Sequence, residues 1–135
     1  MTSFYAPADI LRMVADFAEL HHLDDDITSI RPLDGEAHVH GYDASTHSVV
    51  AMVLRWALAL DVPTVNVKPE SNVNEKPEPK YYRLTVRGKI GGLRVTFVAL
   101  TNGPETEALH DMAIVGDLML DQLAHCVREP EAVTA

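Results

Sequence analysis

Apolar and polar residues alternate along two runs of the sequence, Tyr81–Ile90 and Leu93–Thr101, which Gly91-Gly92 separates. Two such runs joined by two glycines are typical of a β-hairpin, because tight hairpin turns need positive φ and glycine reaches it without a Cβ clash. This register sets Lys89 opposite Arg94. One face of the predicted hairpin is apolar and comprises Leu84, Val86, Ile90, Leu93, Val95, Phe97 and Ala99. The other face carries four cations, Arg83, Arg87, Lys89 and Arg94.

Hydrophobic periodicity predicts helices before this hairpin. Apolar residues at three- and four-residue spacing predict one helix over about Pro7–His22. A second helix, Thr46–Leu60, is apolar nearly all round, and after its first turn only Arg55 interrupts it. A surface helix should have a polar face, so this helix is either sandwiched in the core or packed into an oligomer interface. The residues of that predicted interface are Val49, Val53, Trp56 and Leu60.

Further strands are predicted before the Gly-Gly hairpin. Ile27–Leu33 and Glu36–Tyr42 form a predicted hairpin through the turn Asp34-Gly35, and Thr64–Lys68 alternates like another strand. The polar segment 69–79 contains three prolines, at positions 69, 77 and 79, and predicts a mobile loop.

A last helix is predicted over about Glu105–Val127, from an apolar stripe that has Gly116 in its middle. The sequence thus predicts one α+β domain over residues 1–128 and a flexible tail at 129–135. Its architecture is two-layer, with a mainly antiparallel sheet of about five strands and helices packed on one face.

Charge is distributed unevenly over the 135 residues. The net charge is −9; residues 64–101 contribute +4, whereas residues 1–63 and 102–135 contribute −7 and −6. The predicted helical ends are therefore acidic and the central strands basic. Two explanations suit this pattern: the acidic helices and the basic sheet neutralise one another within the molecule, or the charges form a solvated surface. Net acidity argues against direct nucleic-acid binding, which usually needs a dominant basic surface.

The basic hairpin face is the first candidate site. Lys89 and Arg94 lie directly opposite one another in the predicted register, and like charges so placed are destabilising, by roughly the 0.2–1 kcal/mol assigned to cross-strand pairs. A carboxylate, a phosphate or an acidic protein partner between them would relieve that repulsion. The binding candidates are therefore Arg83, Arg87, Lys89 and Arg94. The alternative is a solvent-exposed hairpin tip where the long side chains splay apart.

Histidines form the second candidate site. His38 and His40 lie two apart on a predicted strand, so both point to one face, and His47 begins the following helix. Such a set could bind zinc or another divalent cation, or the histidines are ordinary polar residues on an exposed strand. The single cysteine, Cys126, lies near the C-terminal end of the last predicted helix, where a thiolate is disfavoured, so we expect a buried structural role.

No nucleophile elbow and no phosphate-binding glycine loop occurs in the sequence, so we name no catalytic residue. One cysteine excludes an intrachain disulfide and favours a reducing compartment. The longest apolar run, Val49–Leu60, is interrupted by Arg55 and too short to span a bilayer, and the first 22 residues are too charged for a signal peptide. We expect a cytoplasmic protein without membrane association.

Two resemblances add to these expectations. Trp56, Ala57, Ala59 and Leu60 on the helix, with Gly88, Gly91, Gly92 and Val95 on the hairpin, make residues 37–101 resemble small uncharacterised α+β proteins of actinobacteria and their phages. This first resemblance implies no known activity.

The order strand 37–42, helix 46–60, and strands 64–68, 81–90 and 93–101 is similar to the βαβββ module of the vicinal-oxygen-chelate (glyoxalase-like) superfamily. That resemblance implies that His38 or His40 ligates a metal and that two modules pair in a dimer. The glutamate expected on the last strand is absent, because residues 93–101 contain no acidic side chain.

Three functional hypotheses follow. The first is a non-catalytic binding protein, such as a phage or mobile-element accessory factor, that acts as a homo-oligomer and binds a protein or anionic ligand. The second is a metal-dependent small-molecule enzyme or binding protein of glyoxalase-like type that uses His38 and His40. The third is an acidic inhibitor that mimics nucleic acid through its helical faces.

Overall fold

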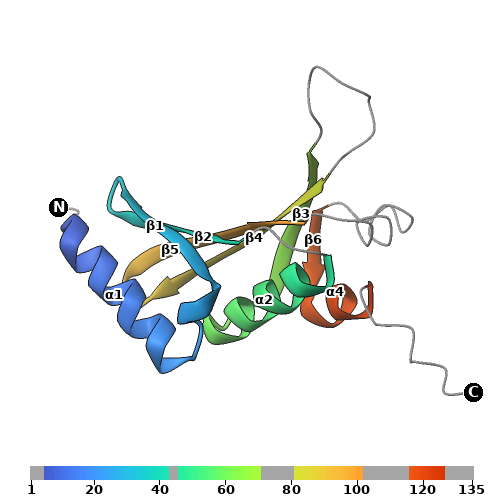
Figure 1. Ribbon diagram of the computed structural model, residues 1–135, viewed down its shortest axis with the longest axis horizontal. Helices are drawn as coiled ribbons and strands as arrows, with labels where there is room; N and C mark the ends of the chain where they lie inside the picture. The colour runs from blue at the N-terminus through green and yellow to red at the C-terminus, as the bar shows by residue number, and fades with distance from the viewer. Residues whose placement is uncertain (1–4, 43–45, 71–80, 102–115, 127–135) are drawn as a thin grey trace, which may run out of the picture.

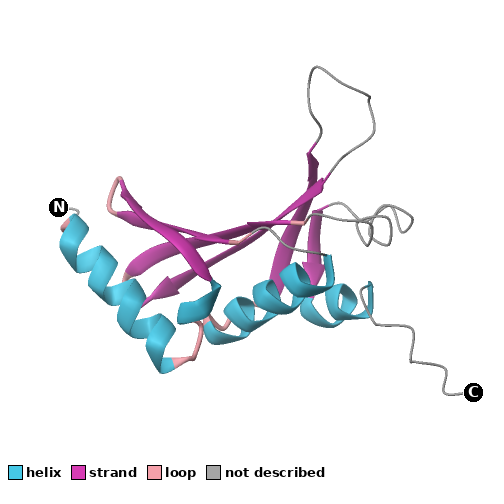
Figure 2. Cartoon of the chain, viewed as in Figure 1, coloured by secondary structure: helices cyan, strands magenta, loops and turns pink. Residues whose placement is uncertain are grey.

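The alternating segments of the sequence form one mixed sheet, and the segments with helical periodicity gather on one side of it (Figures 1 and 2). The computed structural model describes residues 5–42, 46–70, 81–101 and 116–126. In chain order, its elements are α1 (Pro7–Leu20), the 3-10 helix η1 (Asp24–Asp26), β1 (Ile27–Leu33), β2 (Glu36–Gly41), α2 (Thr46–Ala59), β3 (Thr64–Glu70), β4 (Tyr81–Ile90), β5 (Leu93–Leu100), β6 (Gly116–Met119) and α4 (Leu120–Cys126).

The sheet has six strands in the order β1-β2-β5-β4-β3-β6. Strands β2 and β5 run parallel, and all the other neighbours are antiparallel. The α+β class, the mainly antiparallel sheet and the placement of the helices on one face are therefore confirmed, although the sheet has one strand more than predicted. The order of elements from β2 to β5, one strand, one helix and three strands, is also as predicted.

Both predicted hairpins form with the expected register. In the β4–β5 hairpin Ile90 pairs with Leu93 and Lys89 with Arg94. Gly91 has a φ of 61°, which suits the first central position of a type II′ turn. In the β1–β2 hairpin the two turn residues, Asp34 and Gly35, have φ values of 52° and 76°, as a type I′ turn requires. These local turns fix which side chains share a face of the sheet.

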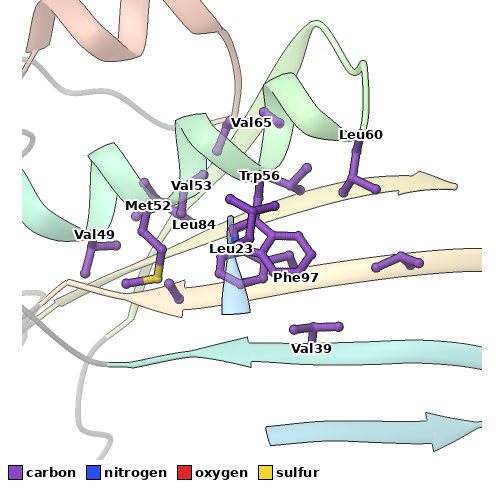
Figure 3. Packing of buried hydrophobic residues seen from close by; sticks show 14 of the residues in the cluster. Leu23, Val39, Val49, Met52, Val53, Trp56, Leu60, Val65, Leu84 and Phe97 are labelled. Carbon is purple, nitrogen blue, oxygen red and sulfur yellow. The ribbon is translucent and has the colours of Figure 1, made fainter. Parts of the chain in front are cut away.

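Helix α2 lies against the apolar face of the sheet and forms the centre of the core (Figure 3). The indole of Trp56 stacks on the ring of Phe97, with centroids 4.5 Å apart and planes inclined by 12°. Strands β3, β4 and β5 contact α2 on the sheet side, and α4 also packs against it. Most of the apolar surface of α2 is thus covered by its own chain, although Leu58 is 69% exposed.

The predicted oligomer interface on α2 corresponds to core residues. Val49, Val53 and Trp56 are completely buried and Leu60 is 7% exposed. Their side chains pack between the helix and the sheet. The sequence offered two explanations for this apolar helix, and burial in the core is the one that accounts for these four residues. A second copy could not reach these four side chains without opening the fold.

Arg55, the charged interruption of α2, is paired across the molecule with η1. Its Nη2 donates to Oδ1 of Asp26 at 2.8 Å and its Nε donates to Oδ2 at 3.3 Å. The Asp26 side chain is only 8% exposed, whereas that of Arg55 is 47% exposed. The pair therefore fixes the outer side of α2 to the segment that connects α1 with β1.

The predicted last helix is wrong over residues 116–119, which form β6 instead. Gly116 has a φ of 106°, a value that a right-handed helix excludes, and β6 pairs with β3 over Thr64–Val67. Helix α4 begins at Leu120. The remainder of the predicted helix before Gly116 lies outside the described residues.

The predicted loop at 69–79 begins too early. Strand β3 continues through Pro69 and Glu70, which pair with Tyr82 and Tyr81. Strand β6 pairs with Thr64–Val67, and no described strand pairs with β3 on that side at Pro69. A proline is tolerated there because no described partner needs its N–H. Residues 71–79 of that loop and the predicted tail at 129–135 lie outside the described residues.

Exchange of Gly88 for alanine tests the contact between the end of α2 and β4. A Cβ at Gly88 would lie 2.9 Å from the Cβ of Leu60, and an atom so close to the backbone cannot easily move away. We expect the Gly88→Ala variant to lose about 1–3 kcal/mol of unfolding free energy. Urea denaturation followed by the fluorescence of Trp56, the single tryptophan, measures the loss. Arg87→Ala, on the opposite face, should change stability by less than about 0.5 kcal/mol; equal stability of the two variants would contradict the described packing.

The Asp26–Arg55 pair can be weighed by a double-mutant cycle. We expect Asp26→Asn and Arg55→Met each to destabilise the protein, and their coupling free energy to be about 1–2 kcal/mol. This coupling free energy is at the lower end of the range for hydrogen bonds between charged groups, because the Arg55 side chain is half exposed to water. The same urea denaturation measures all four proteins of the cycle. Strictly additive single changes would show that the two side chains do not interact in solution.

Candidate functional site

The face of the sheet that α1, α2 and α4 leave uncovered carries the basic residues of the hairpin (Figure 1). Side chains alternate between the two faces of a strand, so the apolar set of β4 and β5 packs against the helices and the intervening set points away from them. Arg83, Arg87, Lys89 and Arg94 are all exposed. We call this side of the sheet the open face, with reference to the described helices.

A shallow depression of about 520 Å³ lies on the open face at the end of the sheet next to the Gly91-Gly92 turn. Three of the predicted binding residues line it together, whereas Arg83 lies farther along β4. The side chains at its wall are Glu36, His38, Arg87, Lys89, Arg94 and Thr96. Strands β2, β5 and β4 therefore each contribute to one site.

The charges in this depression are only partly balanced. Arg94 lies between Lys89 on β4 and Glu36 on β2, and its Nη1 is 3.7 Å from Oε1 of Glu36. Side chains of 73% and 38% exposure hold this ion pair weakly, because water screens it. Arg87 and Lys89 form no ion pair with any part of the chain that the structure describes. Among the described residues, two cations therefore have no countercharge, and they lie beside Arg94, which is paired with Glu36.

The described helices do not neutralise the basic strands. Exposed carboxylates of α1 and η1, among them Asp16, Glu19, Asp24 and Asp25, belong to the layer on the opposite side of the sheet. The sheet itself separates these carboxylates from the open face. The sequence offered neutralisation of the basic sheet by the acidic helices as one explanation of the segregated charge. The described residues show no such neutralisation.

The two histidines of the predicted metal site do share the open face. His38 pairs with Arg31 on β1 and Thr96 on β5, and His40 pairs with Ser29 and Val98. None of these neighbours is a metal ligand of the carboxylate, imidazole or thiolate type. No group of three or more His, Cys, Asp or Glu side chains that could hold a metal ion occurs among the described residues.

The third predicted ligand, the side chain of His47, lies outside the described residues. The structure also shows which residues flank His38. Arg31 on β1 lies on one side of it, and Thr96 on β5 and then Arg87 on β4 lie on the other side. Cationic neighbours oppose the binding of a cation, so this end of the sheet suits an anion better than a metal.

Sequence patterns alone did not identify Glu36, Arg31 or Lys68 as neighbours of the predicted binding residues, whereas the predicted hairpin register already sets Thr96 opposite Arg87. Arg31 could have been found, because the Asp34-Gly35 turn fixes the β1–β2 register and so sets Arg31 beside His38. Glu36 and Thr96 come together only through the parallel pairing of β2 with β5. No local signal specifies that pairing.

Comparisons with protein-family models, with curated proteins and with solved structures gave no match to this chain. The two resemblances drawn from the sequence thus stay predictions. No helix in the described segments has the length and apolar character needed to cross a membrane.

Reversal of the Lys89 charge tests the repulsion on the open face. In a Lys89→Glu variant the residue opposite Arg94 becomes oppositely charged, so we expect the unfolding free energy to rise by roughly 0.2–1 kcal/mol. The gain should shrink as salt screens the pair. Urea denaturation at low and high salt measures it.

The matched control is Arg12→Glu on α1, which changes the net charge by the same amount. Arg12 lies 3.5 Å from Asp9, so its reversal replaces an attraction by a repulsion and should not stabilise the protein. Stabilisation by both reversals would indicate an effect of net charge, and destabilisation by Lys89→Glu would contradict the described pairing.

Proposed function

We propose that this chain is a non-catalytic binding protein that recognises an anionic group of its partner on the open face of the sheet. The observation that carries the proposal is the depression lined by Arg87, Lys89 and Arg94, in which two of the three cations have no countercharge among the described residues. An external anion would supply that charge and would relieve the repulsion between Lys89 and Arg94.

Binding is favoured over catalysis by what the depression offers. Arg87, Lys89 and Arg94 supply charge and hydrogen-bond donors, and Thr96 adds a hydroxyl group in the same row. Such a set orients and neutralises an anion. The metal-dependent alternative gains little support, because the depression offers one carboxylate beside His38, Glu36, which already lies 3.7 Å from Arg94. No group of three or more potential metal ligands occurs among the described residues.

The wider prediction of an accessory factor that acts as a homo-oligomer is retained within this proposal. Such an oligomer would form through surfaces other than the face of α2 that contains Val49, Val53, Trp56 and Leu60, since those side chains are buried. A phage or mobile-element context derives from the sequence resemblance.

Titration with defined anions followed by amide NMR tests the proposal. Inorganic phosphate and poly-L-glutamate, each added at low salt, should shift the amide resonances of β4 and β5 around Arg87, Lys89 and Arg94, and added salt should reverse the shifts. The double variant Arg87→Glu/Lys89→Glu should lose them.

The variant Arg12→Glu, a reversal on the helical side, should keep the response. Shifts confined to the helices, or equal shifts in the double variant, would overturn the proposal. The dispersion of the remaining amide resonances and the fluorescence of Trp56 show whether each variant is folded.

A further inference from the structure

Basic side chains of the open face form a line along β4. Lys68 on β3 pairs with Arg83 at one end of this line, Arg87 lies in its middle, and Lys89 pairs with Arg94 at the other end. Residues two apart on a strand are separated by about 6.6–6.8 Å, so Arg83 and Lys89 are about 20 Å apart. We call these five residues the basic stripe.

The basic stripe is narrow because a carboxylate lies on each side of it. Glu36 on β2 lies beyond Arg94, within 3.7 Å of that guanidinium. Asp117 on β6 lies beyond β3 and accepts a hydrogen bond of 3.0 Å from Nδ2 of Asn66. An anion wider than one chain would meet these negative charges, so the stripe suits a single extended chain.

Two kinds of extended chain carry regularly spaced negative charge, single-stranded nucleic acid and acidic peptide. Proteins that bind single strands generally stack successive bases on several aromatic side chains. Among the described strand residues, the aromatic rings on the open face are the imidazoles of His38 and His40 on β2, and no Phe, Tyr or Trp ring is described along the stripe. The net charge of −9 also repels a long polyanion that extends beyond the stripe.

An extended peptide matches the spacing of the stripe. Its side chains alternate with a period of two residues, so carboxylates at every second position lie on one face about 6.6–6.8 Å apart. The same interval separates Arg87 from Lys89. Carboxylates spaced in this way could face Arg83, Arg87 and Lys89 on β4, whereas the position between Arg83 and Arg87 faces Thr85. Lys68 and Arg94 would contact the carboxylates from the neighbouring strands.

We propose that the basic stripe binds an extended acidic segment of a partner protein, which lies along β4 with a carboxylate at every second residue. This inference rests on the function proposed above. The contacts are charge-assisted hydrogen bonds from the arginines and lysines. Because they are exposed, affinity should be moderate and should fall steeply with salt.

Fluorescence anisotropy with three labelled probes tests this inference. The first probe is a peptide that alternates Glu and Thr, the second is an isomer of the same composition that alternates Glu-Glu with Thr-Thr, and the third is an oligothymidylate of the same charge. When the second peptide is extended, only half of the residues on each of its two faces are glutamates, whereas one face of the first peptide consists of glutamates alone. We expect the alternating peptide to bind tighter than either control by about tenfold.

The variants of the NMR titration serve here as well. Arg87→Glu/Lys89→Glu should abolish binding of the alternating peptide, and Arg12→Glu should leave it unchanged. Equal affinity for the two peptide isomers would overturn the strand-like arrangement, and tighter binding of oligothymidylate would overturn the peptide as ligand. In both cases the anion site of the proposed function would stand. If no probe binds and phosphate and poly-L-glutamate shift no amide of β4 or β5, the proposed function falls as well.

Discussion

The structure depends on the burial of α2 against one face of the sheet. The helix is apolar nearly all round, so it is stable only where protein covers it on several sides, and each of its large side chains that is buried contributes about 1.5–3 kcal/mol. Trp56 stacked on Phe97 marks the centre of that contact. The sheet covers one side of α2, α4 packs on another, and the Asp26–Arg55 pair attaches the exposed side to η1.

Close packing at this contact is reflected in the glycines beneath α2. A Cβ at Gly41 would lie 2.5 Å from Sδ of Met52 and 2.8 Å from Cζ of Phe97, and a Cβ at Gly88 would clash with Leu60. A larger residue at Gly88 would push the helix away from the sheet, and one at Gly41 would force the side chains of Met52 and Phe97 to shift. The glycines are therefore required for the approach of helix and strand and not only for turns.

The site on the open face is a consequence of that arrangement. Because the described helices all occupy the apolar face, the alternate side chains of β4 and β5 remain on the other side, out of reach of the acidic residues of α1 and η1. Arg87 and Lys89 thus lie close to Arg94 and form no ion pair within the described residues. A local arrangement that lowers stability without an evident structural gain is most often found at a functional surface.

Much of the fold follows from the sequence, because its determinants are local. Alternation and the glycine turns specify the β1–β2 and β4–β5 hairpins, including the pairing of Lys89 with Arg94. They also specify that Arg83, Arg87, Lys89 and Arg94 share one face. Helical periodicity specifies α1 and α2, but it failed at β6, where a positive φ at Gly116 and pairing with β3 outweigh an apolar spacing that also suits a helix.

Tertiary structure alone decided the order of the strands and therefore the composition of the site. The parallel pairing of β2 with β5 brings Glu36 beside Arg94 and His38 beside Thr96, and the β3–β4 pairing brings Lys68 beside Arg83. It also decided that Val49, Val53, Trp56 and Leu60 of α2 lie in the core. These outcomes depend on contacts between residues far apart in the chain, whose free energies are set by the packing of the whole sheet, and no short stretch of sequence encodes them.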